Sequence, residues 1–273
     1  MIEIVAEAGL NHNGSLDLAK KLADEALLCG ANIVKYQTYN PDKLLRLNDP
    51  DFELLASLAL KHEEFKELTK FCEGIGIEFM TTPGDLDSLK FAVEELGVKR
   101  IKIGSDDLTN HKLLFAARET MLPIILSTGM ANLSEIYDAM CVTTKHNLTL
   151  LHCVSCYPCR LKDANLRAIT TMREAFKEYE IPIGYSDHTG DKNVVLAAAA
   201  LGATIIEAHF MLLDDKPPVD EAVSYTPKQF KWMVHSIREI EVALGHGRKE
   251  PCAEELKVIN KLRKGEDGLR GVA

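Results

Sequence analysis

Short β-rich runs that end in polar residues recur eight times along the chain, and a stretch with helical apolar spacing follows each one. The runs span residues 2–8, 32–38, 77–82, 100–105, 123–128, 148–155, 182–187 and 204–210. Strands that alternate with helices in this way predict an α/β fold, a single closed (β/α)8 TIM barrel of parallel strands. An open doubly wound sheet is the alternative. Such a sheet usually has fewer strands and often a glycine-rich phosphate loop, and "GLNHNG" after the first run is not G-x-G-x-x-G.

The length and composition suit one such barrel. With 273 residues, 46% of them hydrophobic, the chain can bury a sizeable core. We expect a catalytic barrel domain over residues 1–250 and a C-terminal helix with a polar tail over 251–273. No apolar run approaches about 18 residues, so we expect no membrane span. The first residues lack the basic n-region of a signal peptide, which favours a cytoplasmic location.

The net charge of -9 argues against a nucleic-acid partner, which would require a broad cationic face. Three of the seven cysteines form "CVSCYPC" (Cys153, Cys156, Cys159), a spacing that could indicate a metal or iron–sulfur site. Side chains alternate along a strand, however, so Cys153 and Cys156 would face opposite sides. Reduced thiols are the simpler interpretation.

Polar side chains stand at the end of nearly every predicted strand. In a (β/α)8 barrel these ends meet at one mouth, where the active site lies. They include Glu7, Lys35, Gln37, Thr82, Lys102, Ser105, Ser127, Ser155, Tyr157, Ser186, His188, Glu207 and His209. Two lysines in one mouth are costly unless they meet an anion. Lys35 and Lys102, with the hydroxyls around them, therefore predict a phosphate or carboxylate ligand. The alternative is that these lysines pair with Glu7 and Asp107, which would not exclude a substrate.

Two histidines occupy matching places at the ends of the last two strands, His188 in "GYSDHT" and His209 in "IEAHF". Neighbouring strands are about 4.8 Å apart, so both imidazoles can reach one cation. Two histidines leave coordination positions open, as a catalytic metal requires. The alternative is that one of them only forms a hydrogen bond in the mouth.

Eight segments in order resemble the sialic acid synthase (N-acetylneuraminate synthase) family. They are "AEAGLNHNG", "VKYQT", "TTP", "IKIGS", "ILSTGM", "LHCVSCYP", "GYSDHT" and "IEAHF", and they cover almost the whole chain. The resemblance implies condensation of phosphoenolpyruvate with the open-chain aldehyde of an N-acylated amino sugar such as N-acetylmannosamine. The products would be a nine-carbon 2-keto-3-deoxy acid and phosphate. A divalent cation, Mn²⁺ or Mg²⁺, would polarise the aldehyde.

The resemblance also implies a role for each residue. His188 and His209 would bind the metal. Phosphoenolpyruvate would be held by Lys35, Thr82, Lys102, Ser105, Ser127, Ser155 and Ser186. The sugar would contact Gln37, Tyr157 and Asp220. Glu7, Glu207 and Asp107 would transfer protons or orient water.

Three features depart from the family pattern. The chain reads "SDD" (Ser105-Asp106-Asp107) where many members read "SGD" or "SGE", which adds a carboxylate near the expected phosphate pocket. Asp220 is kept, but within "KPPVDEAVS" in place of a "PGPDH"-like stretch. The sequence ends before the family's C-terminal antifreeze-like domain, which lends an arginine across a dimer to the sugar's N-acyl group. We therefore expect poor handling of N-acetylmannosamine unless a homodimer or a separate domain completes the site.

Two other functions stay open at this stage. A related barrel synthase could make a shorter keto-deoxy acid from a phosphorylated aldose, but it would need a second basic cluster, for which Arg160 and Lys162 are the only local candidates. A non-catalytic sugar-acid-binding relative is the other. The histidines and carboxylates of the predicted mouth argue against it.

Overall fold

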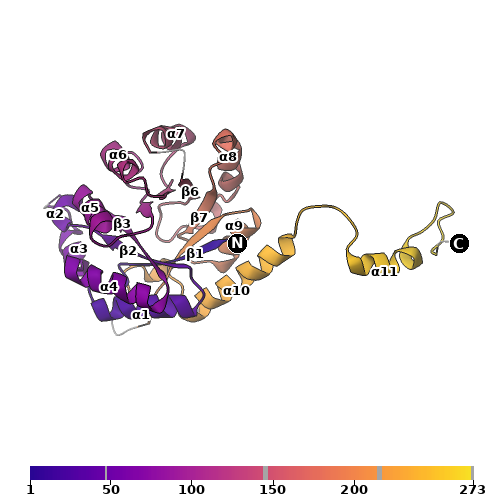
Figure 1. The fold of residues 1–273 in the computed structure, drawn as a ribbon, viewed down its shortest axis with the longest axis horizontal. Coiled ribbons are helices and arrows are strands. Elements are labelled where there is room, and N and C mark those ends of the chain that lie inside the picture. The colour runs from indigo at the N-terminus through magenta and orange to yellow at the C-terminus, as the bar shows by residue number, and fades with distance from the viewer. Residues whose placement is uncertain (47, 144–146, 214–216, 272–273) are drawn as a thin grey trace. The chain divides into compact units, whose positions relative to one another are not determined.

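The computed structural model describes residues 1–46, 48–143, 147–213 and 217–271. It divides into a compact unit, Met1–Glu241, and a second unit, Val242–Ala273. The first unit is the barrel, which begins with β1 (Glu3–Gly9) and includes α10 (Pro227–Leu244) as far as Glu241 (Figure 1). The second contains α11 (Ala253–Leu262), the helix expected near the C-terminus. The division falls at 241/242, and the domain boundary predicted from the sequence lies at 250/251.

All eight predicted strands are present, and every pair is parallel, which confirms the (β/α)8 barrel. They are β1 (Glu3–Gly9), β2 (Ile33–Thr38), β3 (Glu78–Pro83), β4 (Ile101–Ile103), β5 (Ile124–Ser127), β6 (Leu148–His152), β7 (Ile183–Asp187) and β8 (Ile205–His209). The paired order is β3-β2-β1-β8-β7-β6-β5-β4. β3 and β4, at the two ends of this order, also contact each other. The polar strand ends therefore gather around one mouth.

Helices follow the strands and cover the outside of the barrel (Figure 1). They are α1 (Leu16–Leu28), α4 (His62–Ile75), α5 (Leu86–Glu94), α6 (His111–Glu119), α7 (Leu133–Val142), α8 (Arg167–Ala175), α9 (Lys192–Ala200) and α10 (Pro227–Leu244). Two short helices, α2 (Pro41–Leu44) and α3 (Phe52–Leu58), occupy the long insert between β2 and β3. In α1, the hydroxyl of Ser15 accepts a hydrogen bond from the backbone N–H of Leu18 and caps the helix, as expected.

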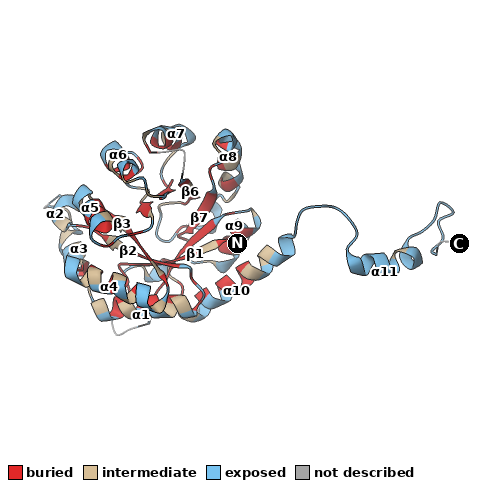
Figure 2. Ribbon diagram, viewed as in Figure 1, coloured by how far each residue is buried: buried red, intermediate tan, exposed pale blue. Residues whose placement is uncertain are grey.

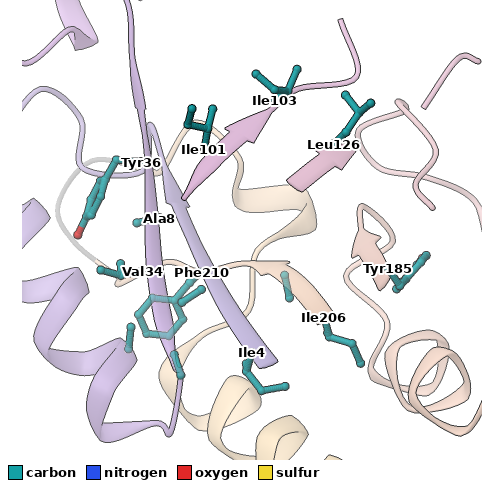
Figure 3. Packing of buried hydrophobic residues seen from close by; sticks show 14 of the residues in the cluster. Ile4, Ala8, Val34, Tyr36, Ile101, Ile103, Leu126, Tyr185, Ile206 and Phe210 are labelled. Carbon is teal, nitrogen blue, oxygen red and sulfur yellow. The ribbon is translucent and has the colours of Figure 1, made fainter. Parts of the chain in front are cut away.

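Each strand has two buried faces. One face packs against the helices and includes Ile4, Val34, Tyr36, Leu126 and Ile206, which Figure 3 shows around the strands. Figure 2 shows the same burial pattern, with buried residues in the strands and exposed residues on the outer faces of the helices. The other face points into the barrel, where a separate apolar cluster lies: Val5, Ile33, Met80, Ile125, Leu151 and Ile205. This cluster forms the apolar floor of the barrel interior, and the mouth lies above it.

Among the described residues, no helix is both long enough and apolar enough to cross a membrane.

Candidate active site

A charged layer lies directly above the apolar floor of the barrel. Side chains two residues apart on a strand point the same way. The residues two positions after Val5, Ile33, Met80, Ile125 and Ile205 therefore also face the interior. They are Glu7, Lys35, Thr82, Ser127 and Glu207. The same alternation of side chains that places the apolar floor in the interior therefore also places these polar and charged groups in the mouth.

These groups line a pocket of about 320 Å³. Every predicted site residue contributes to its lining except Asp107 and Asp220. The lining residues are Glu7, Lys35, Gln37, Thr82, Lys102, Gly104, Ser105, Asp106, Ser127, Met130, Ser155, Tyr157, Ser186, His188, Glu207 and His209. Side chains from all eight strands, or from the turns that follow them, therefore meet in this pocket.

Lys35 is almost fully buried and lies between two carboxylates. Its Nζ is 2.9 Å from Oε2 of Glu7 and 3.6 Å from Oε2 of Glu207, and it donates a hydrogen bond of 3.2 Å to the hydroxyl of Thr82. Burial would lower the pKa of Lys35, but the Glu207 and Glu7 carboxylates raise it above the usual lysine value. Lys35 is therefore a fixed ammonium. The predicted alternative of a Lys35–Glu7 ion pair is confirmed.

Lys102 is the second buried ammonium. Its Nζ donates 2.7 Å to Oγ of Ser127 and 3.1 Å to the carbonyl of Ile103, and it lies 3.9 Å from Oε1 of Glu207. Burial and the nearby charge of Lys35 lower the pKa of Lys102, against the opposing pull of Glu207. The expected pairing of a mouth lysine with Asp107 is absent from the described contacts of Lys102, whose carboxylate neighbour is Glu207.

The pKa values of the two carboxylates, Glu7 and Glu207, shift in opposite directions. Burial raises the pKa of Glu7, and the Glu207 charge raises it further, although Lys35 opposes both. Burial would also raise the pKa of Glu207, but Lys102, Lys35 and the 2.9 Å hydrogen bond from Ser186 lower it below the usual value. Two carboxyl groups with opposite shifts in one cleft suit a general acid and a general base.

The two histidines approach each other as predicted, with ring centroids 5.5 Å apart. Nδ1 of His188 lies 2.7 Å from the carbonyl of Val154, so it carries the proton and Nε2 keeps a lone pair. That lone pair accepts from the hydroxyl of Tyr157 at 3.2 Å. Burial and the neighbouring His209 lower the pKa of His188 to about 4, which keeps the ring neutral at physiological pH.

His209 faces a carboxylate instead. Its Nδ1 is 3.2 Å from Oδ2 of Asp220, and although burial would lower its pKa, this carboxylate raises it. Asp220 therefore lies behind His209 rather than in the lining. Asn11, which the sequence analysis did not single out, holds it there: Oδ1 of Asn11 accepts from the backbone N–H of Asp220 at 2.9 Å. The two segments are far apart in sequence, so no local pattern signals this contact.

The donor set fits a divalent cation with two protein ligands. Both rings have an outer partner, Val154 for His188 and Asp220 for His209, as metal-ligating histidines usually do. The Oε2 atoms of Glu7 and Glu207 lie near the Lys35 ammonium, and Nδ1 of His209 lies near the Asp220 carboxylate, so these buried atoms have charged neighbours within the mouth. No cluster of three or more potential metal ligands occurs in the described ranges, so substrate or water would supply the remaining positions.

The turn after β4 differs from the expectation for Asp107. The strand ends at Ile103, before the predicted run does, and a turn closed by the Asp107 N–H to the Gly104 carbonyl follows. Asp107 turns away from the pocket and accepts 2.8 Å from the side chain of Asn110, while its neighbour Asp106 lines the pocket. The extra carboxylate of "SDD" thus lies in the mouth, as expected, and Asp107 does not.

Cys153 and Cys156 of the "CVSCYPC" segment differ in their environments. Cys153 is buried, with its Sγ 3.1 Å from the hydroxyl of Ser105, whereas Cys156 is exposed. Both residues follow the end of β6 at His152, so the alternation predicted for a strand does not apply to them. Among the described residues they form no metal cluster.

The fold and the mouth define a (β/α)8 barrel whose strand ends hold two buried ammonium groups, two carboxylates and two imidazoles. The NeuB family model matches residues 22–249, and the chain belongs to this family. It is 38% identical over 282 residues to the N,N'-diacetyllegionaminic acid synthase of Legionella pneumophila, covering 96% of this chain and 78% of that protein. It is 32% identical over 276 residues to the N-acetylneuraminate-9-phosphate synthase of Homo sapiens, covering 96% and 76%.

A solved structure agrees with these sequence matches. The N-acetylneuraminic acid (sialic acid) synthetase of Leptospira borgpetersenii, in complex with citrate, superposes with a TM-score of 0.89 at 40% identity. The match covers 94% of this chain and 90% of that one. The resemblance to the sialic acid synthase family is therefore confirmed.

Proposed function

We propose that the protein is a metal-dependent synthase that condenses phosphoenolpyruvate with an N-acylated amino sugar to give a nonulosonic 2-keto-3-deoxy acid and phosphate. The observation that carries the proposal is the pair of buried ammonium groups, Lys35 and Lys102, each of which donates a hydrogen bond to a hydroxyl that lines the pocket. Family membership and the names of the relatives support the same reaction class. A cytoplasmic location remains a prediction.

The charge balance of the mouth indicates that an anionic substrate would bind together with added positive charge. Lys35 and Lys102 are matched by Glu7 and Glu207, so the four buried side chains are together neutral. Phosphoenolpyruvate adds a carboxylate and a phosphate. An uncompensated buried charge costs several kcal/mol. A divalent cation at the histidine pair, and a proton on Glu7, whose pKa is already raised by burial, would offset the added charge.

The lysines and hydroxyls would bind and orient phosphoenolpyruvate. Lys102 and Ser127 approach from β4 and β5, while Lys35 and Thr82 approach from β2 and β3. Ser105, Ser155 and Ser186 complete the polar lining. Ammonium and hydroxyl donors of this kind hold phosphate and carboxylate oxygens through charge-assisted hydrogen bonds.

The condensation requires one proton donor and one acceptor. C3 of phosphoenolpyruvate forms a bond to the aldehyde carbon, and the aldehyde oxygen takes up a proton to become a hydroxyl. Water then adds to C2 and gives up one proton; the C2–O bond to phosphate breaks, and the new C2 hydroxyl gives its remaining proton to the departing phosphate to leave the 2-keto group. Glu7, with its raised pKa, can hold the proton for the first step, and ionised Glu207 can accept the proton in the second.

His188 and His209 would hold Mn²⁺ or Mg²⁺, which supplies Lewis-acid polarisation of the aldehyde when bound. The outer contacts with Val154 and Asp220 orient the two rings for this purpose. Gln37, Tyr157 and Asp106 stand on the same pocket and are the residues we assign to the sugar side.

The test measures phosphate release and product mass together. The purified chain is incubated with phosphoenolpyruvate and Mn²⁺ and a panel of aldoses: N-acetylmannosamine, its 6-phosphate, a diacetamido hexose, and a phosphorylated tetrose and pentose. We expect equal amounts of phosphate and keto-deoxy acid with an acylated amino sugar. Turnover only with a phosphorylated tetrose or pentose would favour the shorter-chain synthase. Tight phosphoenolpyruvate binding without phosphate release from any aldose would favour a non-catalytic binding protein.

A further inference from the structure

Asp187, the residue before His188, is the most completely buried carboxylate among the residues that the structure describes, at 0% exposure. Five donors reach it. Oδ1 accepts from the Tyr185 hydroxyl at 3.1 Å and from the backbone N–H and the hydroxyl of Thr189 at 3.1 and 2.7 Å. Oδ2 accepts from the N–H of Gly190 at 3.1 Å and from the Tyr225 hydroxyl at 2.8 Å. Among the described residues, no lysine or arginine forms an ion pair with it.

Tyr225 is the donor that comes from another part of the chain. It lies in the segment between β8 and α10, and its ring is buried. Its backbone N–H donates to the carbonyl of His209 at 2.8 Å, and its own carbonyl accepts from Met211 at 3.1 Å. Tyr225 therefore binds the backbone of His209 through its own backbone and binds the carboxylate of Asp187, next to His188, through its hydroxyl.

We propose that the Tyr225–Asp187 hydrogen bond is a positioning device that fixes the distance between the His188 and His209 imidazoles and so sets the affinity of the pair for a divalent cation. The inference rests on the proposed function, because it requires that the two histidines share a metal. Burial of a carboxylate costs free energy unless hydrogen bonds offset its desolvation. Here five donors do so, and the Tyr225 donor ties the end of β7 to the segment that follows β8.

The chain offers a matched control in Tyr185. Both phenols are about 2% exposed, and both donate to the same carboxylate. Tyr185, however, lies on β7 itself, two residues from Asp187, and makes no link to β8 through this bond. Tyr185→Phe and Tyr225→Phe each remove one hydroxyl from Asp187, so a purely structural role for the carboxylate predicts similar effects of the two changes.

The experiment titrates Mn²⁺ into the wild type and both variants and follows free Mn²⁺ by electron paramagnetic resonance, with phosphoenolpyruvate affinity measured separately without metal. Outer partners of metal ligands typically change metal affinity by about 10- to 100-fold. We expect Tyr225→Phe to weaken Mn²⁺ binding about tenfold, Tyr185→Phe to stay within about twofold of the wild type, and phosphoenolpyruvate affinity to be unchanged in both.

Each other outcome overturns a definite statement. Equal Mn²⁺ affinity in Tyr225→Phe and wild type, or equal weakening in both variants, overturns the positioning role alone. Failure of the wild type to bind Mn²⁺ overturns the metal site of the proposed function. If Tyr225→Phe does not fold, Asp187→Asn takes its place against the same control, and a wild-type Mn²⁺ affinity in that variant overturns the inference.

Discussion

Replacing Lys102 by methionine tests the anion-binding function of the mouth most directly. Methionine keeps most of the length of the buried stem and removes only the charge and its donors. In the wild type, Nζ of Lys102 donates to Ser127 and the Ile103 carbonyl, and its electrostatic partner is Glu207 at 3.9 Å. The variant leaves Lys35 as the one ammonium between two carboxylates.

The magnitude follows from these contacts. A hydrogen bond to a charged group contributes about 1.5–3 kcal/mol, and a factor of ten in affinity corresponds to about 1.4 kcal/mol. We therefore expect phosphoenolpyruvate to bind roughly 10- to 150-fold more weakly. The fold should survive, because Glu207 keeps its 2.9 Å bond from Ser186 and its contact with Lys35, and Glu7 can take up a proton.

Isothermal titration calorimetry with phosphoenolpyruvate gives the dissociation constant directly. Lys99→Met is the control, because Lys99 is exposed and precedes the start of β4, at the opposite end of that strand from the mouth. It removes the same charge from the chain and should leave the affinity unchanged. A folded Lys102→Met variant that binds phosphoenolpyruvate as tightly as the wild type would refute the assignment.

The gathering of these side chains at one mouth was predictable because it follows from the alternation of side chains along a strand. Side chains two apart on a strand share a face, so Lys35 with Gln37, and Glu207 with His209, could be assigned to the interior without any knowledge of distant contacts. Parallel pairing then places strand ends together at one edge. The register bears this out: Glu7 lies opposite Lys35 on one side and opposite His209 on the other.

Contacts beyond the strand ends were not predictable in the same way. Asp107 was expected to handle protons, but the pleat stops at Ile103, so parity no longer decides which of two neighbouring aspartates faces inward. Asn11 and Tyr225 act on residues that are 209 and 38 positions away in sequence. Such hydrogen bonds depend on how loops cross the mouth, and no residue periodicity encodes that path.

The remaining predictions concern the metal, the acid and the pH. His209→Ala should reduce bound Mn²⁺ to background by elemental analysis and chelator should abolish turnover, whereas the exposed His235→Ala should change neither; full metal content in His209→Ala would contradict the ligand assignment. Glu7→Gln should lower kcat by at least about 100-fold with little change in phosphoenolpyruvate affinity, and the reverse pattern would mean that Glu7 only balances Lys35. The pH dependence follows from Lys102, whose pKa burial and a neighbouring ammonium lower. Only the charged form attracts the phosphate, so affinity should persist below that pKa and decrease as the pH rises through it, earlier than for an ordinary lysine. Lys102→Arg keeps its charge at every accessible pH. Its affinity should therefore decrease less steeply in calorimetric titrations across the alkaline range, and a profile identical to that of the wild type would show that another group controls the binding.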